Sequence, residues 1–427
     1  MDNDTRKKEL KKISEGEAAQ TGLNLFYHGE SHTFKAYRVP LDLLVYNKYN
    51  GRISSQVKSF EHDQRPLNPE DPEDVKIIEK FLLESNEGKN KDTRKDIREK
   101  GQRLYGVVTN EGVIIDGNRR ASILKSLYND QSIKFDERTR FSHFMAIILP
   151  ENVDYKDILY LETSIQLGED EKVGYDPIAK YLKARDMILA GLTTKDVSTA
   201  MSISEKTAKE YLEVLALMDD YLDYLGYDGL YTTLSGTEDQ FLQLRNWIDT
   251  YSKGCTNADW AYGEEDISDL KRICFDYIRA RYEGKDYRNI GVAGKGTTTS
   301  IFKIEGVWVP FRDNHYKMVS PISEKEGTVE QYREQFPNKD ISKVLNGRDK
   351  DWATKVSGDL ASNLKEGVDM VDNIRSDNPV RQISKAILIL NTIDPESKKF
   401  KTQEARNLLG DLLRRVNFLL EQNSGEK

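Results

Sequence analysis

Apolar and polar positions in the first third of the chain predict strands mixed with helices. The run from Phe34 to Val39 is strand-like. Residues 72–84 place apolar side chains at helical spacing behind Pro72, a residue that suits the first turn of a helix. A second, very polar helix is expected over 92–99. This mixture predicts an α/β unit.

The most regular stretch follows, as LYGVVTNEGVIIDGNRRASILKSLYND. It predicts a strand at Val107 and Val108, a turn containing Gly112, and a second strand that ends at Ile115. A tight turn at Gly117 then leads into a helix. A further strand, HFMAIIL, ends at Pro150.

From about 154 to 226 the pattern becomes helical. Three helices are expected over 177–217, and the last two have the apolar spacing of a helix-turn-helix, with Ser204 as the cap of the second. The apolar positions that predict this motif are Val197, Met201, Ile203, Ala208 and Leu212.

The remainder of the chain alternates helical pieces with strand-like ones, among them IFKI and VWVPF, and predicts an α+β region. Two amphipathic segments, 380–392 and 402–421, close it. The second has a wide apolar stripe, which must be buried on its own domain or on a second copy. The expected division is a charged extension over 1–35, an α/β domain over 36–153, a helix-turn-helix bundle over 154–230, and the α+β region over 231–427.

Composition narrows the class of protein. The chain has 427 residues, 37% hydrophobic and 32% charged, yet its 14 Phe, 22 Tyr and 4 Trp suffice for packed cores. The sequence contains no apolar run of membrane-spanning length and begins without a secretory signal. Two cysteines and five scattered histidines predict neither a zinc site nor a disulfide framework, so a cytoplasmic protein is expected.

The charge is unevenly distributed. The net charge is −8, but the window 87–125 holds ten basic and six acidic residues, which leaves −12 for the rest of the chain. A local positive site in an acidic protein favours a small anion as ligand over a long polyanion. The alternative is a solvated charged helix.

The segment IDGNRRA, 115–121, is the strongest candidate site. A glycine at a strand-to-helix turn lets backbone approach a ligand, and the amides at a helix N-terminus favour an anion. Arg119 and Arg120 in that first turn would add charge-assisted contacts to phosphate oxygens. The alternative is a surface turn with two solvated arginines.

The same residues resemble a known family. DGNRRASILK is similar to the arginine-rich box of the ParB/sulfiredoxin-like superfamily, specifically the ParB N-terminal nucleotide-binding domain. Gly101-Gln102 resembles an upstream box of that family, without its proline, and Glu162 to Leu167 resembles a downstream Glu-Asn-x-x-Arg box in which the asparagine and arginine are replaced. The resemblance spans roughly 36–225, about half the chain.

The resemblance implies a nucleoside triphosphate ligand, CTP or ATP, accompanied by Mg²⁺. Asp116 and Glu162 would be the candidate catalytic carboxylates, as metal ligands or, for Glu162, as the base for an attacking water. Ordinary salt bridges to arginine are the alternative. The nucleotide-binding residues would be Gly101, Gln102, Gly117, Asn118, Arg119, Arg120 and Gln166.

A helix-turn-helix follows the nucleotide domain in that family, which implies duplex DNA as a partner. Lys206, Thr207 and Lys209 would project from the recognition helix. The net charge of 177–217 is only +1, so a purely structural bundle remains the alternative. The family also commonly dimerises through its C-terminal part, and a homodimer is expected here.

These features predict a ParB-like, nucleotide-binding, DNA-associated switch with slow hydrolysis. A first alternative is an NTP-dependent enzyme or nuclease on the same fold, in an anti-phage or mobile-element system. A second is an interaction scaffold without a ligand, because a fold does not determine a function.

Overall fold

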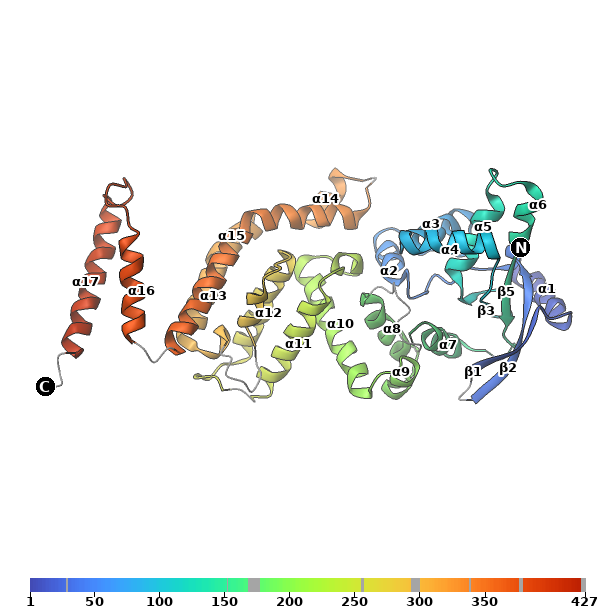
Figure 1. The fold of residues 1–427 in the computed structure, drawn as a ribbon, viewed down its shortest axis with the longest axis horizontal. Coiled ribbons are helices and arrows are strands. Elements are labelled where there is room, and N and C mark those ends of the chain that lie inside the picture. Colours follow the sequence, from blue (N-terminus) through green and yellow to red (C-terminus); the bar gives the residue numbers. More distant parts are fainter. Residues whose placement is uncertain are drawn as a thin grey trace.

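The computed structural model describes residues 1–27, 30–151, 153–167, 177–254, 257–292, 300–337, 339–375 and 379–423. The molecule is long and mostly helical, with one small mixed sheet near the N-terminal end and a helical hairpin at the other (Figure 1). Across the described ranges, no helix combines the length and apolar character that crossing a bilayer requires.

The sheet has five strands in the order β1-β2-β5-β3-β4. Neighbouring strands are antiparallel except β3 and β5, which run parallel. The predicted strands at 34–39, 107–108, 113–115 and in HFMAIIL all lie in this sheet. The strands are β1 (Gln20–Tyr27), β2 (Glu30–Pro40), β3 (Gly106–Val108), β4 (Ile114–Asp116) and β5 (His143–Ile148).

Helices cover this sheet and share one core with it. Ile78 and Leu82 of α3, Ile97 of α4, Leu127 of α5 and Phe144 of β5 are all buried together. The helices are α1 (Asn3–Glu15), α2 (Ser54–Asp63), α3 (Pro72–Glu84), α4 (Glu87–Lys100), α5 (Asn118–Asn129) and α6 (Phe135–Arg138).

The first unit begins earlier than expected. Leu10 of α1 is buried in the same core, and β1 pairs with β2 along the edge of the sheet. Residues 1–35 are therefore part of the α/β unit and not a separate extension. The sequence did not indicate that α1 joins the core, because this charged helix buries only one narrow face, formed by Arg6 and Leu10.

Four helices follow: α7 (Tyr155–Leu167), α8 (Pro177–Leu189), α9 (Thr194–Ala200) and α10 (Glu205–Leu225). The predicted helix-turn-helix is formed by α9 and α10. Thr193 and Asp196 make a reciprocal capping box at the start of α9, and the Ser204 side chain caps α10. Val197, Met201 and Ala208 are buried between the helices, as the apolar spacing predicted.

The prediction of an α+β region after residue 230 is wrong. IFKI forms the 3-10 turn η5 (Ile301–Lys303), and VWVPF lies in α13. Short apolar runs do not distinguish a strand from a fully buried helix, and Trp308 here is buried on a helix. The described parts of 231–423 contain helices only: α11 (Glu238–Ser252), α12 (Glu264–Arg279), α13 (Glu305–Ser323), α14 (Val329–Gln335), α15 (Ile341–Arg375), α16 (Pro379–Asn391) and α17 (Gln403–Asn423), with η3 (Tyr231–Leu234) and η4 (Lys285–Asn289).

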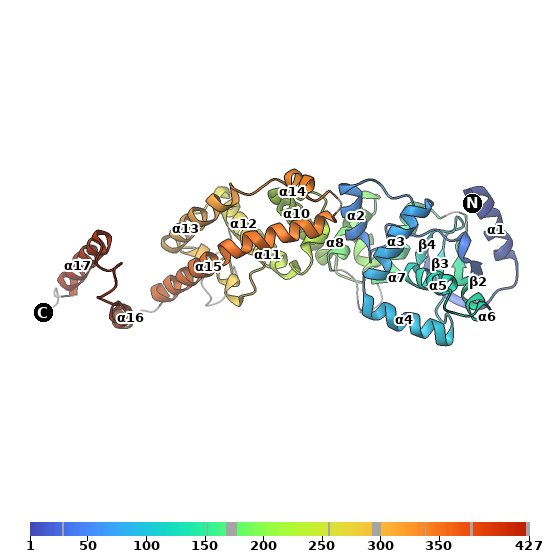
Figure 2. The same cartoon turned by 90° about the horizontal axis from the view of Figure 1, so that it is seen from above.

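The last two helices stand apart from this core. The α16–α17 hairpin projects beyond the end of α15 in two perpendicular views (Figures 1 and 2). Its large apolar side chains are exposed, including Leu388 at 66% and Leu413 at 61%. The two amphipathic segments are thus helices, as predicted, but neither is buried on its own domain.

Candidate anion-binding site

The turn between β4 and α5 has the backbone conformation that its sequence predicted. Gly117 has φ +103°, and a Cβ at that position would lie 2.5 Å from the Phe144 ring. Only glycine fits both constraints. No side chain caps the N-terminus of α5, and its first turn contains no acidic residue. The first amides of α5 are therefore available to an outside anion.

Arg119 adds an unpaired charge to this turn. Its Nη1 atom is buried and has no hydrogen-bond partner among the described residues. Burial, and then repulsion from Arg52 and Arg120, lowers the pKa of the Arg119 guanidinium to about 10. A partly buried cation with no counter-charge is destabilising, and an anionic ligand would relieve that destabilisation.

Arg120 has a different environment, although it is the next residue. Its Nη2 donates to Asp116 Oδ2 at 2.6 Å, and its Nη1 donates to the Leu104 carbonyl at 3.0 Å. Arg120 therefore ties the loop after α4 to the start of α5. Asp116 is neutralised by this ion pair, which was the alternative reading for that carboxylate.

Gly101 and Gln102 shape the same loop. Gly101 ends α4 with φ +74°. The Gln102 amide pairs with both the N–H and the carbonyl of Met145 at 2.8 Å, one residue before Ala146, where β5 begins to pair with β3. The Gln102 side chain therefore forms its hydrogen bonds with backbone atoms. It lies close to the turn but is not grouped with Arg119 and Arg120.

Asn118 and Gln166 are buried beneath the turn. Asn118 Oδ1 accepts from the Asn47 amide at 2.9 Å, and its Nδ2 donates to the Ile114 carbonyl at 3.0 Å. Gln166 Nε2 donates to the Ile115 carbonyl at 3.4 Å. Both side chains support the backbone from which Arg119 projects.

Glu162 lies at the centre of a buried polar network. Lys183 Nζ donates to Glu162 Oε2 at 3.0 Å, Asn47 Nδ2 donates to the same oxygen at 3.2 Å, and the Gly51 amide donates to Oε1 at 3.3 Å. Burial raises the pKa of Glu162, and Lys183 opposes that rise. Both oxygens are occupied and the residue is fully buried, so this geometry leaves no position for an attacking water.

A metal site is not formed by these carboxylates. Asp116 pairs with Arg120 and Glu162 with Lys183, and the described residues contain no group of three or more His, Cys, Asp or Glu side chains suited to a metal ion. The residues present therefore do not fit a protein-held Mg²⁺.

The predicted DNA-contacting residues lie on the first turns of α10. Lys206 Nζ is 3.9 Å from Glu210 and Lys209 Nζ is 3.3 Å from Glu205. The Thr207 amide donates to the capping Ser204 hydroxyl at 3.0 Å. Both lysines are exposed, but each has a carboxylate neighbour on its own helix.

Three residues of the site were not predicted. Asn47 and Arg52 belong to the segment YNKYNGR, and neither was among the candidate site residues. Lys183 contributed only to the net charge of 177–217, yet its side chain is 1% exposed. Its position inside the apolar run of α8 was the available signal, because that helix is buried on most sides.

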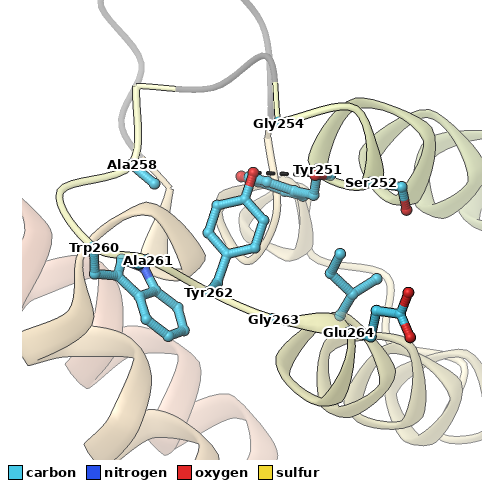
Figure 3. Close-up of a pocket in the computed structure, with 10 residues that line it drawn as sticks. Tyr251, Ser252, Gly254, Ala258, Trp260, Ala261, Tyr262, Gly263 and Glu264 are labelled. Atoms are coloured by element: carbon cyan, nitrogen blue, oxygen red, sulfur yellow. Dashed lines mark hydrogen bonds between the residues drawn. The ribbon is translucent and has the colours of Figure 1, made fainter.

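A separate hollow lies between α11 and α12 (Figure 3). Tyr251, Trp260 and Tyr262 line it, and its volume is about 470 Å³. The Tyr262 hydroxyl donates to the Tyr251 carbonyl and Trp260 Nε1 donates to the Phe302 carbonyl, so these polar groups are already paired. None of the predicted site residues lines this hollow.

Comparisons with known proteins do not identify the family of this chain. No family model and no curated protein matches the chain. Among solved structures, one match is the C-terminally truncated chromosome-partitioning protein ParB from Caulobacter crescentus complexed with CTP-gamma-S, at 13% identity. The match covers 49% of this chain and 92% of that chain, with a TM-score of 0.19. A score this low carries no weight for fold or ligand, so the ParB-like fold remains a prediction from the sequence motifs.

Proposed function

We propose that this protein binds a nucleoside triphosphate at the N-terminus of α5. The observation that carries the proposal is the partly buried Arg119 guanidinium, whose Nη1 has no hydrogen-bond partner among the described residues, beside Arg52 and the uncapped helix end. Polyphosphate oxygens would accept from Arg119, Arg52 and the first amides of α5. The sequence resemblance favours CTP or ATP as the nucleotide.

The loop that contains Arg52 would transmit occupancy to the helical part. Its Asn47 amide donates to Asn118 of α5, while the Tyr49 carbonyl accepts from Lys183 of α8 at 3.0 Å. Glu162 of α7 holds the same loop through Asn47 and Gly51. A ligand that draws Arg52 toward α5 would therefore act on α7 and α8, which favours a switch.

A switch suits the site better than a metabolic enzyme does. Both candidate catalytic carboxylates are held in ion pairs, so any hydrolysis is expected to be slow. DNA association belongs to the same proposal, through the α9–α10 helix-turn-helix that follows the α/β unit.

The test is calorimetric titration of the full chain with CTP, ATP, GTP and UTP, with and without Mg²⁺. Arg119→Ala removes hydrogen bonds to a charged ligand, each worth about 1.5–3 kcal/mol, so affinity should fall about tenfold to a hundredfold. Arg120→Ala should weaken binding too, but also lower the melting temperature, because it breaks the tie to Asp116 and Leu104.

Arg103→Ala is the matched control. Arg103 lies in the same unit and pairs with Asp96 on the surface, so its loss changes the net charge equally. Its triphosphate affinity should equal that of the wild type. Unchanged affinity in a folded Arg119→Ala variant, or no triphosphate binding by the wild type, would remove the site from consideration.

A further inference from the structure

A row of basic residues on α4 forms a second positive surface. Lys91, Arg94, Lys95 and Arg98 occupy positions i, i+3, i+4 and i+7, and this spacing places them on one face of the helix. With Glu99 and Glu137 they line a surface hollow of about 550 Å³. Neither Arg52 nor Arg119 lines it, so it is distinct from the α5 site.

Two members of the row are anchored and two are not. Arg94 donates to Asp130 and to Ser126, both at 2.7 Å, and Arg98 Nε lies 3.5 Å from Glu137. Lys91 and Lys95 are exposed and have no carboxylate partner among the described residues. The hollow therefore has four cations against two carboxylates in its lining, which leaves an excess of positive charge.

The position and context of α4 make this charge available to a large partner. Figure 2 shows α4 along the outer edge of the α/β unit, away from α10. The lysines on the first turns of α10 are flanked by carboxylates, and α10 has six acidic and two basic residues. Phosphates would thus meet less repulsion at α4 than along α10.

We propose that the α4 row binds the phosphate backbone of duplex DNA. Seven residues of helix rise about 10 Å, which is the length of about three base-pair steps of about 3.4 Å along the duplex axis, so the row is long enough to contact more than one phosphate. Such contacts position a duplex without reading its sequence. The choice of DNA over the small anion that the charge of 87–125 favours rests on the DNA association in the proposed function, and not on nucleotide binding.

The test is fluorescence anisotropy of a short labelled duplex of mixed sequence, without nucleotide, at several salt concentrations. Lys91→Glu/Lys95→Glu should weaken binding about tenfold at low salt, and the slope of log affinity against log salt should become shallower by about two. Lys91→Gln/Lys95→Gln removes charge without adding repulsion. It should lose less affinity than the glutamate variant, but its salt slope should become shallower by the same amount.

Lys350→Glu/Lys355→Glu on exposed positions of α15 is the matched control for net charge and should change binding little. The inference is overturned if the wild type does not bind the duplex, if a folded α4 variant binds like wild type, or if polyglutamate competes as well as DNA. The α4 variants should keep wild-type triphosphate affinity. The DNA-binding test of α4 and the triphosphate-binding test of Arg119 can therefore fail independently.

Discussion

Arg119 and Arg120 are neighbours in the sequence, yet their side chains have different surroundings. The sequence predicted the glycine turn, the helix start and an arginine pair, because each follows from local chain geometry. It could not separate the roles of the pair. Arg120 is satisfied by the Leu104 carbonyl, a contact that depends on how the loop after α4 returns to the sheet.

Lys183 and Glu162 show the same limit more strongly. They lie on different helices, and their pairing depends on how α7 packs against α8. The apolar run around Lys183 could indicate that the lysine is buried, but it does not identify Glu162 as its partner. The motif resemblance did identify Glu162, but the structure supports it as an anchor, and its catalytic role stays a prediction.

Removing one partner of the buried Glu162–Lys183 pair should destabilise the fold. Lys183→Met leaves Glu162 as an uncompensated buried charge, so the free energy of unfolding should fall by about 3–5 kcal/mol. Glu162→Gln/Lys183→Met removes both charges and should recover much of that loss. Urea unfolding followed by circular dichroism measures both, and Lys180→Met, on the partly exposed face of α8, is the comparison. A Lys183→Met variant as stable as wild type would show that the pair does not hold the helices together.

At the scale of elements, local signals predicted the helix-turn-helix well. Thr193, Asp196 and Ser204 cap their helices by short-range hydrogen bonds, which sequence can indicate directly. The buried apolar positions agree as well. Whether the motif contacts DNA depends on surface charge, which the capping pattern does not determine.

Charge reversal tests the α10 surface. If its first turns contact DNA, Lys206→Glu/Lys209→Glu should weaken duplex binding, with the salt slope shallower by about one unit for each lost phosphate contact. Anisotropy at several salt concentrations measures this, again with the α15 lysine variant as control. Binding that is unchanged at every salt concentration would restrict DNA contact to other surfaces, such as α4.

For the whole molecule, the order of units was predictable and the architecture of the second half was not. The α/β unit contains regular alternation and tight turns, which identify strands and helices locally. The helices after residue 230 escaped the sequence analysis for different reasons: α12 buries the continuous run 273–279, and the short apolar run VWVPF of α13 resembles a strand. The two amphipathic segments at the end have a clear helical stripe.

That stripe leads to a prediction about assembly. Leu388, Ile389, Leu408 and Leu413 of the α16–α17 hairpin are exposed, and an apolar surface of this kind marks an interaction site. We expect a homodimer in which two hairpins cover each other. Light scattering should find a dimer for the full chain and a monomer for a chain that ends at residue 378.

Two controls make the assembly test decisive. The truncated chain should keep the melting temperature of the α/β and helical units, because their core clusters contain no residue beyond Val371. Leu412→Asp/Leu419→Asp, which places charge on the stripe of α17, should also give a monomer without removing any chain. A full-length protein that is monomeric at micromolar concentration would contradict the dimer, and an unfolded truncated chain would show instead that the hairpin belongs to the domain core.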